Sequence, residues 1–467
     1  MRSSRRLRAA LPFRRGAAPA SELFFRNLPP NTQADEVRAM ISPFCNFLDV
    51  RIPSDPVTGY PKPFCFVSIA PAEADTAVKA MHGMEWKGFN IKVRLNGAAA
   101  QPFKPAHPPV RSPATKNAIV TNKHIGNAHT PDEVLSIFEY RGCEFNAVNF
   151  ATCLHKLGSL SRDFDLSSKP LIAKLLESAA SNMLEEADEW SPQCLANASW
   201  GAAKIGEDAC AFFARAANEA PNKIAHFTCQ NIANMTWAYA TAGFQAPVLF
   251  EAFAPQVRKK VGGFKAQELS ITVWAYAAAG VQAPEVFEAV SLQARKMMPL
   301  FSAQNLANTA WAFATAGVEA PKMFQSLAWA ATMKIGTFNP QALANTVWAY
   351  ATAKVDAPEL FQAVAFESSA KIGTFNAQAL STTVWAFATA QVEAPSLFEA
   401  VAEEATLKIT TFVPQALAKT AWAFARAGVE APVLFESVAE EAAKKILAFT
   451  PVNLSNTAWA FATAGVS

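Results

Sequence analysis

The sequence predicts a small α+β domain near the N-terminus, joined by a linker to an all-α solenoid of helical hairpins. Two observations predict this fold class. Eight tryptophans recur at a constant interval of 37 residues: Trp200, Trp237, Trp274, Trp311, Trp348, Trp385, Trp422 and Trp459. A fixed period of this length without strand-like alternation is typical of stacked helical hairpins. Between residues 22 and 96, by contrast, apolar strand-like runs alternate with short helical segments.

Composition narrows the class of protein. The chain has 467 residues, 51% of them hydrophobic, which excludes disorder over most of its length. Its formal charge of +3 is too small to indicate a nucleic-acid partner by itself. No uncharged apolar run is long enough to span a bilayer, so no membrane partner is expected. The seven cysteines include no Cys-x-x-Cys pair, which fits a reducing compartment and predicts no zinc site.

The first 20 residues form a basic leader. They contain six arginines, with serine and alanine and no acidic residue. This composition predicts an organelle transit peptide, and a mitochondrial location is the first expectation, with plastid or nucleus as alternatives. A disordered basic tail that contacts RNA or carries a nuclear address is the other interpretation.

Residues 21–97 are predicted to form the small domain. Strands are expected at 23–28, 48–52, 64–69 and 91–95, and helices at 32–40 and 72–81, which gives a β-α-β-β-α-β order. Side chains two apart in a strand project from one face, so Phe64 and Phe66 share a face. Phe24 joins them if the two strands are adjacent.

These residues resemble the RNA recognition motif family, because 23–28 matches its hexamer and 62–69 its octamer. The resemblance implies a ferredoxin-like fold that binds single-stranded RNA. It implies RNA-binding roles for Phe24, Arg26, Lys62, Phe64 and Phe66, with the rings stacking on bases and Lys62 contacting phosphate. Pro63, Cys65 and Ile69 depart from the family pattern. The alternative is that these aromatics are ordinary core or bind a protein.

Residues 98–129, rich in proline and alanine, are predicted to be an extended linker. The solenoid is expected over 130–467 and to begin with a degenerate repeat near 146–157. A loop around 161–170 breaks the period. The sequence stops after the first helix of the last repeat, and the uncovered apolar face favours a truncated gene product over an exposed terminal helix.

Each repeat is predicted to hold two helices. The first begins at a cap followed by proline, as at Asn339-Pro340, Ser191-Pro192 and Thr450-Pro451. It ends at a glycine in most copies: Gly243, Gly280, Gly317 and Gly428. The second helix begins at a proline that keeps the period: Pro247, Pro284, Pro321, Pro358, Pro395 and Pro432.

The first helix of each repeat is predicted to carry a functional stripe. At 100° per residue, Gln341, Asn345, Trp348 and Thr352 fall on one face, which is expected to be concave. The position three residues before the tryptophan varies: Asn197, Asn234, Ile271, Asn308, Asn345, Thr382, Lys419 and Asn456. A varying polar side chain beside a constant ring is typical of reading one RNA base per repeat. The alternative is that ring and amide only pack between repeats.

A basic column recurs 23 residues after the tryptophans: Lys223, Lys260, Lys334, Lys371, Lys408 and Lys445. These lysines are predicted to contact phosphates. A lysine in the last turn of a helix can equally complement the helix dipole, and this alternative stays open. Carboxylates earlier in the same helices, among them Glu399, Glu403, Glu436 and Glu440, are expected to repel RNA from that face.

The Leu-Ala-Asn-Thr-x-Trp-Ala-Phe/Tyr-Ala pattern resembles the heptatricopeptide and octotricopeptide repeats of organellar RNA-binding proteins, and helical subunits of mitochondrial RNA-editing complexes. The resemblance implies a role in processing, stability, editing or translation of organellar transcripts, within a ribonucleoprotein complex. The RAP domain that often closes such proteins is not seen.

Catalysis is not expected. The six histidines are scattered without a partner carboxylate or cysteine, and no glycine-rich phosphate loop occurs, so neither a cofactor nor a small-molecule substrate is predicted. The serious rival is a protein-binding scaffold in which only the small domain contacts RNA. The charge of the concave face distinguishes the two, because a neutral to basic polar face favours RNA and an apolar patch favours a protein.

Overall fold

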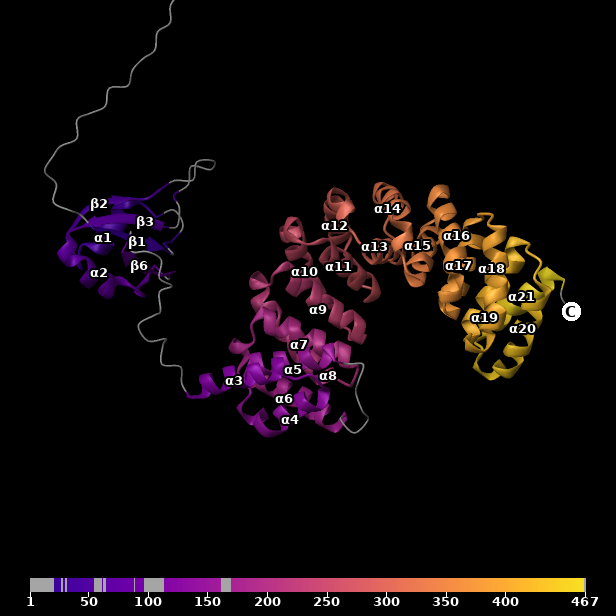
Figure 1. Ribbon diagram of the computed structural model, residues 1–467, viewed down its shortest axis with the longest axis horizontal. Helices are drawn as coiled ribbons and strands as arrows, with labels where there is room; N and C mark the ends of the chain where they lie inside the picture. The colour runs from indigo at the N-terminus through magenta and orange to yellow at the C-terminus, as the bar shows by residue number, and fades with distance from the viewer. Residues whose placement is uncertain are drawn as a thin grey trace, which may run out of the picture. The chain divides into compact units, whose positions relative to one another are not determined.

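The computed structural model describes residues 21–26, 28–29, 32–53, 61, 64–87, 89–95, 113–160 and 169–465. The predicted leader and Lys62 lie outside these residues. The chain divides into two compact units, with the boundary between residues 110 and 111, and each unit is considered by itself (Figure 1).

The first unit is an antiparallel sheet with two helices. Its elements are β1 (Ser21–Arg26), α1 (Ala34–Ile41), β2 (Phe47–Arg51), β3 (Phe64–Ile69), α2 (Ala74–Met81) and β6 (Lys92–Leu95), with a small hairpin of β4 (Glu85–Trp86) and β5 (Phe89–Asn90). The sheet has the strand order β2-β3-β1-β6. The predicted β-α-β-β-α-β order is confirmed, and the β4–β5 hairpin is an addition to it.

One face of this sheet forms the core. Leu23 and Phe25 from β1 and Val67 from β3 are fully buried, together with side chains from both helices. Because alternate residues of a strand point to opposite faces, the side chains between them project from the other face. Cys65 belongs to the core, and burial raises the pKa of its thiol to about 12, so it stays protonated near neutral pH. The face opposite the helices is therefore available for binding.

The second unit is a stack of helical hairpins. Its first helices are α3 (Pro113–Asn127), α5 (Ala147–Ser159), α7 (Pro192–Ile205), α9 (Cys229–Ala242), α11 (Ala266–Ala278), α13 (Ala303–Thr315), α15 (Pro340–Ala353), α17 (Ala377–Ala390), α19 (Pro414–Ala427) and α21 (Pro451–Ala464). Its second helices are α4 (Pro131–Arg141), α6 (Lys169–Glu185), α8 (Cys210–Glu219), α10 (Pro247–Lys260), α12 (Pro284–Met297), α14 (Pro321–Lys334), α16 (Pro358–Lys371), α18 (Pro395–Leu407) and α20 (Pro432–Lys444).

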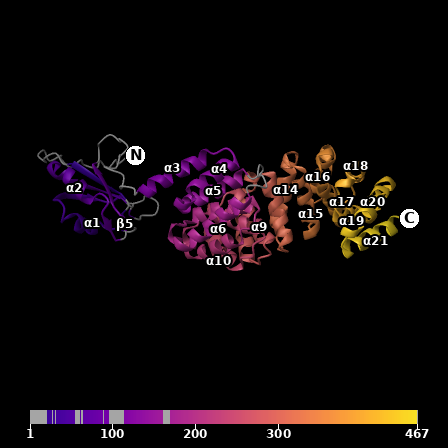
Figure 2. The same ribbon diagram turned by 90° about the horizontal axis from the view of Figure 1, so that it is seen from below.

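Figure 1 shows these hairpins following one another along an arc, with α10, α12 and α14 along its outer edge. Figure 2, seen from below, shows the same succession from α3 to α21. Around this part of the arc, the first helices α11 and α13 therefore lie on its inner side and the second helices on its outer side.

Capping places the helices where the sequence predicts them. The Asn339 side chain accepts a hydrogen bond from the Ala342 N–H at 2.8 Å, and a proline occupies the first helical position. The terminal glycine of α9, Gly243, has a φ of +66°, a left-handed conformation that glycine adopts without a Cβ penalty. Lys354 and Gln391 adopt the same conformation at the ends of α15 and α17. The predicted helix starts and ends are confirmed.

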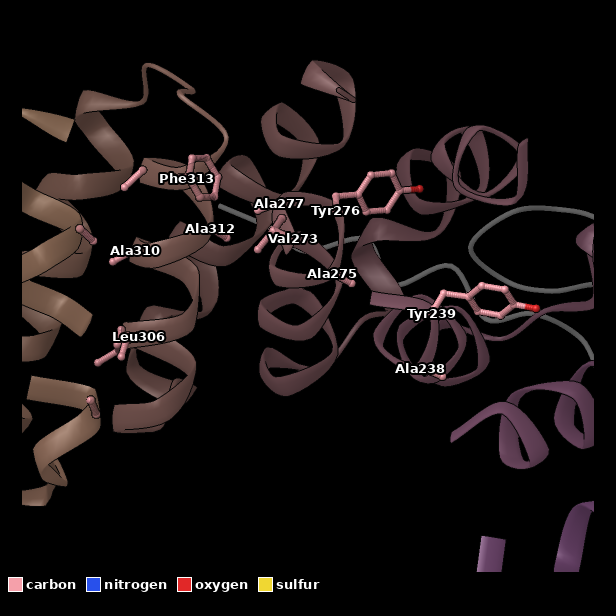
Figure 3. Packing of buried hydrophobic residues seen from close by; sticks show 14 of the residues in the cluster. Ala238, Tyr239, Val273, Ala275, Tyr276, Ala277, Leu306, Ala310, Ala312 and Phe313 are labelled. Atoms are coloured by element: carbon pink, nitrogen blue, oxygen red, sulfur yellow. The ribbon is translucent and has the colours of Figure 1, made fainter. Parts of the chain in front are cut away.

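Tyrosine and phenylalanine join the two helix layers across repeats (Figure 3). The Tyr276 hydroxyl donates to the Phe250 carbonyl at 2.8 Å, and its ring meets the Phe250 ring edge-on with 5.0 Å between centroids. Burial raises the pKa of Tyr276, so the hydroxyl stays a donor. Phe313 holds the same place in the next repeat, packed on Phe287. Buried alanines such as Ala275 and Ala312 allow neighbouring first helices to approach closely.

The first hairpins depart from the prediction. Residues 113–127 form helix α3 within the predicted linker, so the linker over 98–129 is too long and the solenoid begins one helix earlier than expected. Ala118, Thr121 and Ile125 lie on one face of α3 and are buried. The Asn149 amide in α5 donates to the Ala118 carbonyl at 2.9 Å. The prolines and polar residues of 98–129 predict an extended segment from local sequence alone. Packing against α5 stabilises the helix instead.

Candidate nucleic-acid interface

Three phenylalanines cluster on the exposed face of the small sheet. Strands β1 and β3 pair antiparallel with Phe24 opposite Phe66. The ring centroids lie 5.5 Å apart for Phe24 and Phe64, 5.2 Å for Phe24 and Phe66, and 5.9 Å for Phe64 and Phe66. All three rings are half-buried, so each presents part of its surface to solvent. The structure confirms that Phe24, Phe64 and Phe66 share a face, since the two strands are adjacent.

Two arginines flank the phenylalanines. The Arg51 guanidinium in β2 lies 5.1 Å from the Phe66 ring centroid, and that of Arg94 in β6 lies 5.0 Å from the Phe24 centroid. Arg51 also faces the Glu22 carboxylate at 3.5 Å. Neither arginine is among the site residues predicted from the sequence, although each is the direct cross-strand partner of the ring it contacts. Rings edged by guanidinium groups can stack bases and neutralise phosphates.

For the other two predicted RNA-binding residues of the small domain, Arg26 and Lys62, the structure describes only the backbone of Arg26. Arg26 ends β1 opposite Phe64 in the β1–β3 register. Its side chain is outside the described part of the structure, as is Lys62. Their RNA contacts stay predictions.

The stripe predicted on the first helices is the side of those helices that solvent reaches. Between Gln341 and Thr352, all described residues, Gln341, Asn345, Trp348 and Thr352 are exposed or half-buried, and the eight others are buried. Among the described residues of these four columns in α7 to α21, none is a carboxylate, and Lys204, Lys419 and Arg426 add positive charge. A polar, neutral to basic inner face favours RNA over an apolar protein surface as its partner.

The tryptophans form a ladder along this face. The ring centroids of Trp200 and Trp237 lie 6.2 Å apart, and those of Trp311 and Trp348 lie 6.3 Å apart. His155 extends the ladder by one hairpin, because its ring lies 4.8 Å from that of Trp200. His155 is not among the predicted site residues, because it breaks the tryptophan period. It stands nine residues after its N-cap Asn146, the spacing that separates each tryptophan from its own cap.

Cations lie over several of these rings. The Lys204 ammonium is 5.9 Å from the Trp200 centroid and 5.6 Å from that of Trp237. Lys419 lies 5.7 Å from the Trp385 centroid, so a residue of the variable column covers the tryptophan of the preceding repeat. Burial lowers the pKa of Lys419. The result is an inner face on which a ring and a charged or polar group alternate.

A pocket of about 420 Å³ opens between α17 and α19 on this face. Gln378 and Thr382 line one side and Gln415 and Lys419 the other. Each side thus supplies one constant and one variable position of the stripe. Amides, a hydroxyl and an ammonium in one pocket provide both donors and acceptors for the edge of a base.

The predicted basic column has a structural role. The Lys371 ammonium donates to the carbonyls of Gly336 at 2.8 Å and Phe338 at 3.0 Å, both in the preceding repeat. It also pairs with Glu367 at 2.7 Å. Lys260, Lys334, Lys408 and Lys445 make equivalent pairs of carbonyl contacts, and Lys223 makes one. These lysines join successive repeats, and their phosphate contacts stay a prediction.

The described residues contain no group of three or more His, Cys, Asp or Glu side chains able to hold a metal ion. None of the helices in this part of the chain is both long and apolar enough to cross a membrane.

Two protein-family models match the chain. The RNA recognition motif matches residues 23–92, and the RNA-editing substrate-binding complex 6 protein family matches 171–365 and 355–466, more than half of the chain. Together with the strand order, the first match identifies the small unit as an RNA recognition motif domain. The second match covers the helical array from α6 to α21.

Similar proteins match mainly in short segments. Small ribosomal subunit protein uS19m of Arabidopsis thaliana is 31% identical over 77 residues, and the match spans 16% of this chain and 36% of the relative. The putative RNA-binding protein RbpA of a Nostoc strain is 32% identical over 72 residues, 15% of this chain and 71% of the relative. The first two RRM domains of yeast poly(U) binding protein align at 23% identity, with a TM-score of 0.17, over 20% of this chain and 55% of theirs.

Proposed function

The chain belongs to the RNA-editing substrate-binding complex 6 protein family, and we propose that it is a non-catalytic, single-stranded RNA-binding subunit of an RNA-editing complex. In this role the small domain stacks bases on its sheet, and the inner face of the solenoid holds a further stretch of the same RNA. The partners are RNA and the proteins of the complex. No catalytic step is assigned to the chain.

The observation that carries the proposal is the cluster of Phe24, Phe64 and Phe66 with Arg51 and Arg94 at its edges. Three rings with centroids 5.2–5.9 Å apart offer stacking planes to neighbouring bases. The arginines supply charge for the phosphates beside those bases. A face that bound only apolar protein surface would not need a guanidinium group on each side of the rings.

The solenoid contributes through its variable column. Asn345 and Thr382 are half-buried on the inner face, so their polar atoms can meet a base that approaches from that side. Because this column holds an amide in some repeats and a hydroxyl, ammonium or aliphatic side chain in others, repeats that differ at this position prefer different bases. The same assignment covers Asn197, Asn234, Asn308, Lys419 and Asn456.

A scaffold role for the solenoid is the second candidate, and the tryptophan ladder favours it. Trp311 and Trp348 lie against each other and are only half exposed, which suits a packing role between repeats. In this case only the small domain contacts RNA, and the array holds proteins of the complex.

Photocrosslinking of the full chain to single-stranded RNA, followed by mass spectrometry of the crosslinked peptides, distinguishes these functions. We expect crosslinks at peptides containing Phe24 and Phe64, and at the first-helix peptides of several repeats. The peptide 355–371, which holds the second helix α16 and ends at Lys371, whose ammonium group binds carbonyls, serves as internal comparison. Crosslinks confined to residues 21–97 would leave the scaffold role for the solenoid, and none in either region would contradict RNA binding.

We also propose a mitochondrial location, which the composition of residues 1–20 and the organellar resemblance of the repeats support. A reporter fused to these residues is expected to enter mitochondria and to lose the leader. The matched control carries the same leader with its six arginines replaced by glutamine. If the wild-type fusion stays in the cytosol or enters the nucleus, the leader has another role.

A further inference from the structure

The pocket between α17 and α19 contains the one charged residue of the variable column. In most repeats this position is an asparagine, whereas α17 holds Thr382 and α19 holds Lys419. Both line the pocket of about 420 Å³, together with Gln378 and Gln415. Its lining residues, all within the described part of the chain, include no carboxylate. The pocket is therefore polar and carries a positive charge that nothing in its own walls neutralises.

The Lys419 ammonium group has no acceptor of its own. It is half-buried and lies 5.7 Å from the Trp385 ring centroid, but it has neither an ion-pair partner nor a hydrogen-bond acceptor among the described residues. Lys408, which is also half-buried, donates instead to two backbone carbonyls at 2.8 Å and pairs with Glu404 at 2.6 Å. A partly desolvated ammonium group without a partner is unfavourable, and a ligand with acceptor atoms relieves this cost.

Three other polar side chains of the pocket are also free to bind a ligand. Those of Gln378, Thr382 and Gln415 are exposed or half-buried and make no hydrogen bond to any residue that the structure describes. Each amide offers both donors and an acceptor, and so does the hydroxyl. Val413 and Ala416 add aliphatic surface to the same lining. Apolar surface with a few polar groups that fix orientation is the usual composition of a pocket for a small ring system.

We propose that this pocket selects a guanine base of the bound RNA, an assignment that rests on the RNA-binding function proposed for the chain. The Lys419 ammonium group donates to O6 and N7 of the base. Guanine presents these two acceptors side by side on one edge, and a lysine offers donors only. The side-chain carbonyl oxygens of Gln378 and Gln415 can accept from the N1–H and amino groups on the other edge of the base.

Other groups of an RNA chain satisfy the pocket less completely. Adenine and cytosine present an amino group on the edge that Lys419 would meet, and an ammonium group cannot accept a hydrogen bond from it. Uracil presents a single acceptor there. A phosphate group accepts from the ammonium group but leaves the amide carbonyl oxygens without a donor. Guanine is the one base that uses both the positive charge and the acceptors of the pocket.

The test compares short uridine oligomers that differ only in their central base. We expect the full chain to bind the oligomer with a central guanine at least about fivefold more tightly than the one with uracil, the scale of one good side-chain contact to a base. Fluorescence anisotropy measures the dissociation constants. A central 7-deazaguanine, which lacks the N7 acceptor, should lose most of this preference. Inosine keeps O6 and N7 and should still be preferred over uracil.

Variants of the full chain assign the preference to the pocket. Lys419→Asn introduces the side chain that most repeats carry at this position, so the helices should be kept, and it should abolish the preference for guanine over uracil. Lys419→Arg should preserve it, because arginine also donates to O6 and N7. Lys204→Asn is the matched control: Lys204 lies over the Trp200 and Trp237 rings and not in the pocket. It should weaken binding of all oligomers alike and leave the preference unchanged.

The outcomes separate this pocket from RNA binding in general. If the parent binds none of the oligomers, the proposed RNA-binding function fails, and the guanine assignment fails with it. If the parent binds RNA without preferring guanine, or if Lys419→Asn keeps the preference, RNA binding stands and the pocket does not select guanine. If Lys419→Asn weakens all oligomers equally and keeps the preference, Lys419 contacts phosphate. Melting temperatures recorded in parallel establish that each variant is folded.

Discussion

Replacing Phe64 and Phe66 together with alanine is expected to weaken binding of a short single-stranded RNA by about 1–3 kcal/mol for each base that the rings stack. Both rings project from the sheet face opposite the core, and Cys65, the buried residue between them, is unchanged. The fold of the domain should therefore survive. The measurement is the dissociation constant of the full chain for RNA, by fluorescence anisotropy, with melting temperature recorded in parallel.

Phe44→Ala is the matched control for this double variant. Phe44 is also an exposed phenylalanine of the small domain, but it lies in the turn after α1 and not on the sheet. Its replacement should leave RNA affinity unchanged. If the Phe64/Phe66 variant binds RNA as tightly as the parent, the sheet face does not stack bases. If it melts at a much lower temperature, the rings stabilise the domain and their role in binding must be measured with single variants.

The second large effect is expected at Asn345. Replacing it with threonine, a hydroxyl in place of an amide, should change the preference of the full chain at one nucleotide by about 1–3 kcal/mol, the scale of one good side-chain contact to a base. The salt dependence of binding should hardly change, because no positive charge is removed. Selection from a randomised RNA pool, followed by affinities for single-base variants, measures the preference.

The reciprocal variant, Thr382→Asn, is the control. The two positions are equivalent in successive repeats, both half-buried on the inner face. If the column reads bases, the two substitutions should change preference at neighbouring nucleotides, and in opposite senses. Should Asn345→Thr instead lower the melting temperature and leave base preference unchanged, the column is structural. The solenoid would then act as a protein scaffold.

Much of the solenoid could be predicted from the sequence because its signals are local. A cap, a proline and a glycine act within one turn of the chain, so the helix boundaries of each repeat follow from a few residues. The stripe of Gln341, Asn345 and Trp348 could be predicted for the same reason, since the angle between residues on one helix needs no knowledge of its neighbours.

The predictions failed where the signal is not local. Helix α3 contains no repeat motif and follows a proline-rich segment, and it is stabilised by contacts such as that of Asn149 with the Ala118 carbonyl, 31 residues away in sequence. His155 was missed because it replaces the tryptophan that marks the period. In both cases the role of the residues depends on a contact with a neighbouring helix: α3 packs on α5, and the His155 ring lies beside that of Trp200.

The sequence by itself determined the repeat, the helix ends and the face that each side chain occupies, because these depend on backbone geometry over a few residues. Only the tertiary structure placed Arg51 and Arg94 beside the phenylalanines, since strand order in a sheet depends on packing. Only the tertiary structure identified the hydrogen-bond acceptors of lysines such as Lys371, which are backbone carbonyls 33 and 35 residues earlier in the chain. An ammonium group binds any acceptor that the fold brings within reach. For these lysines the acceptors lie in the preceding repeat, so the sequence of one repeat does not reveal them.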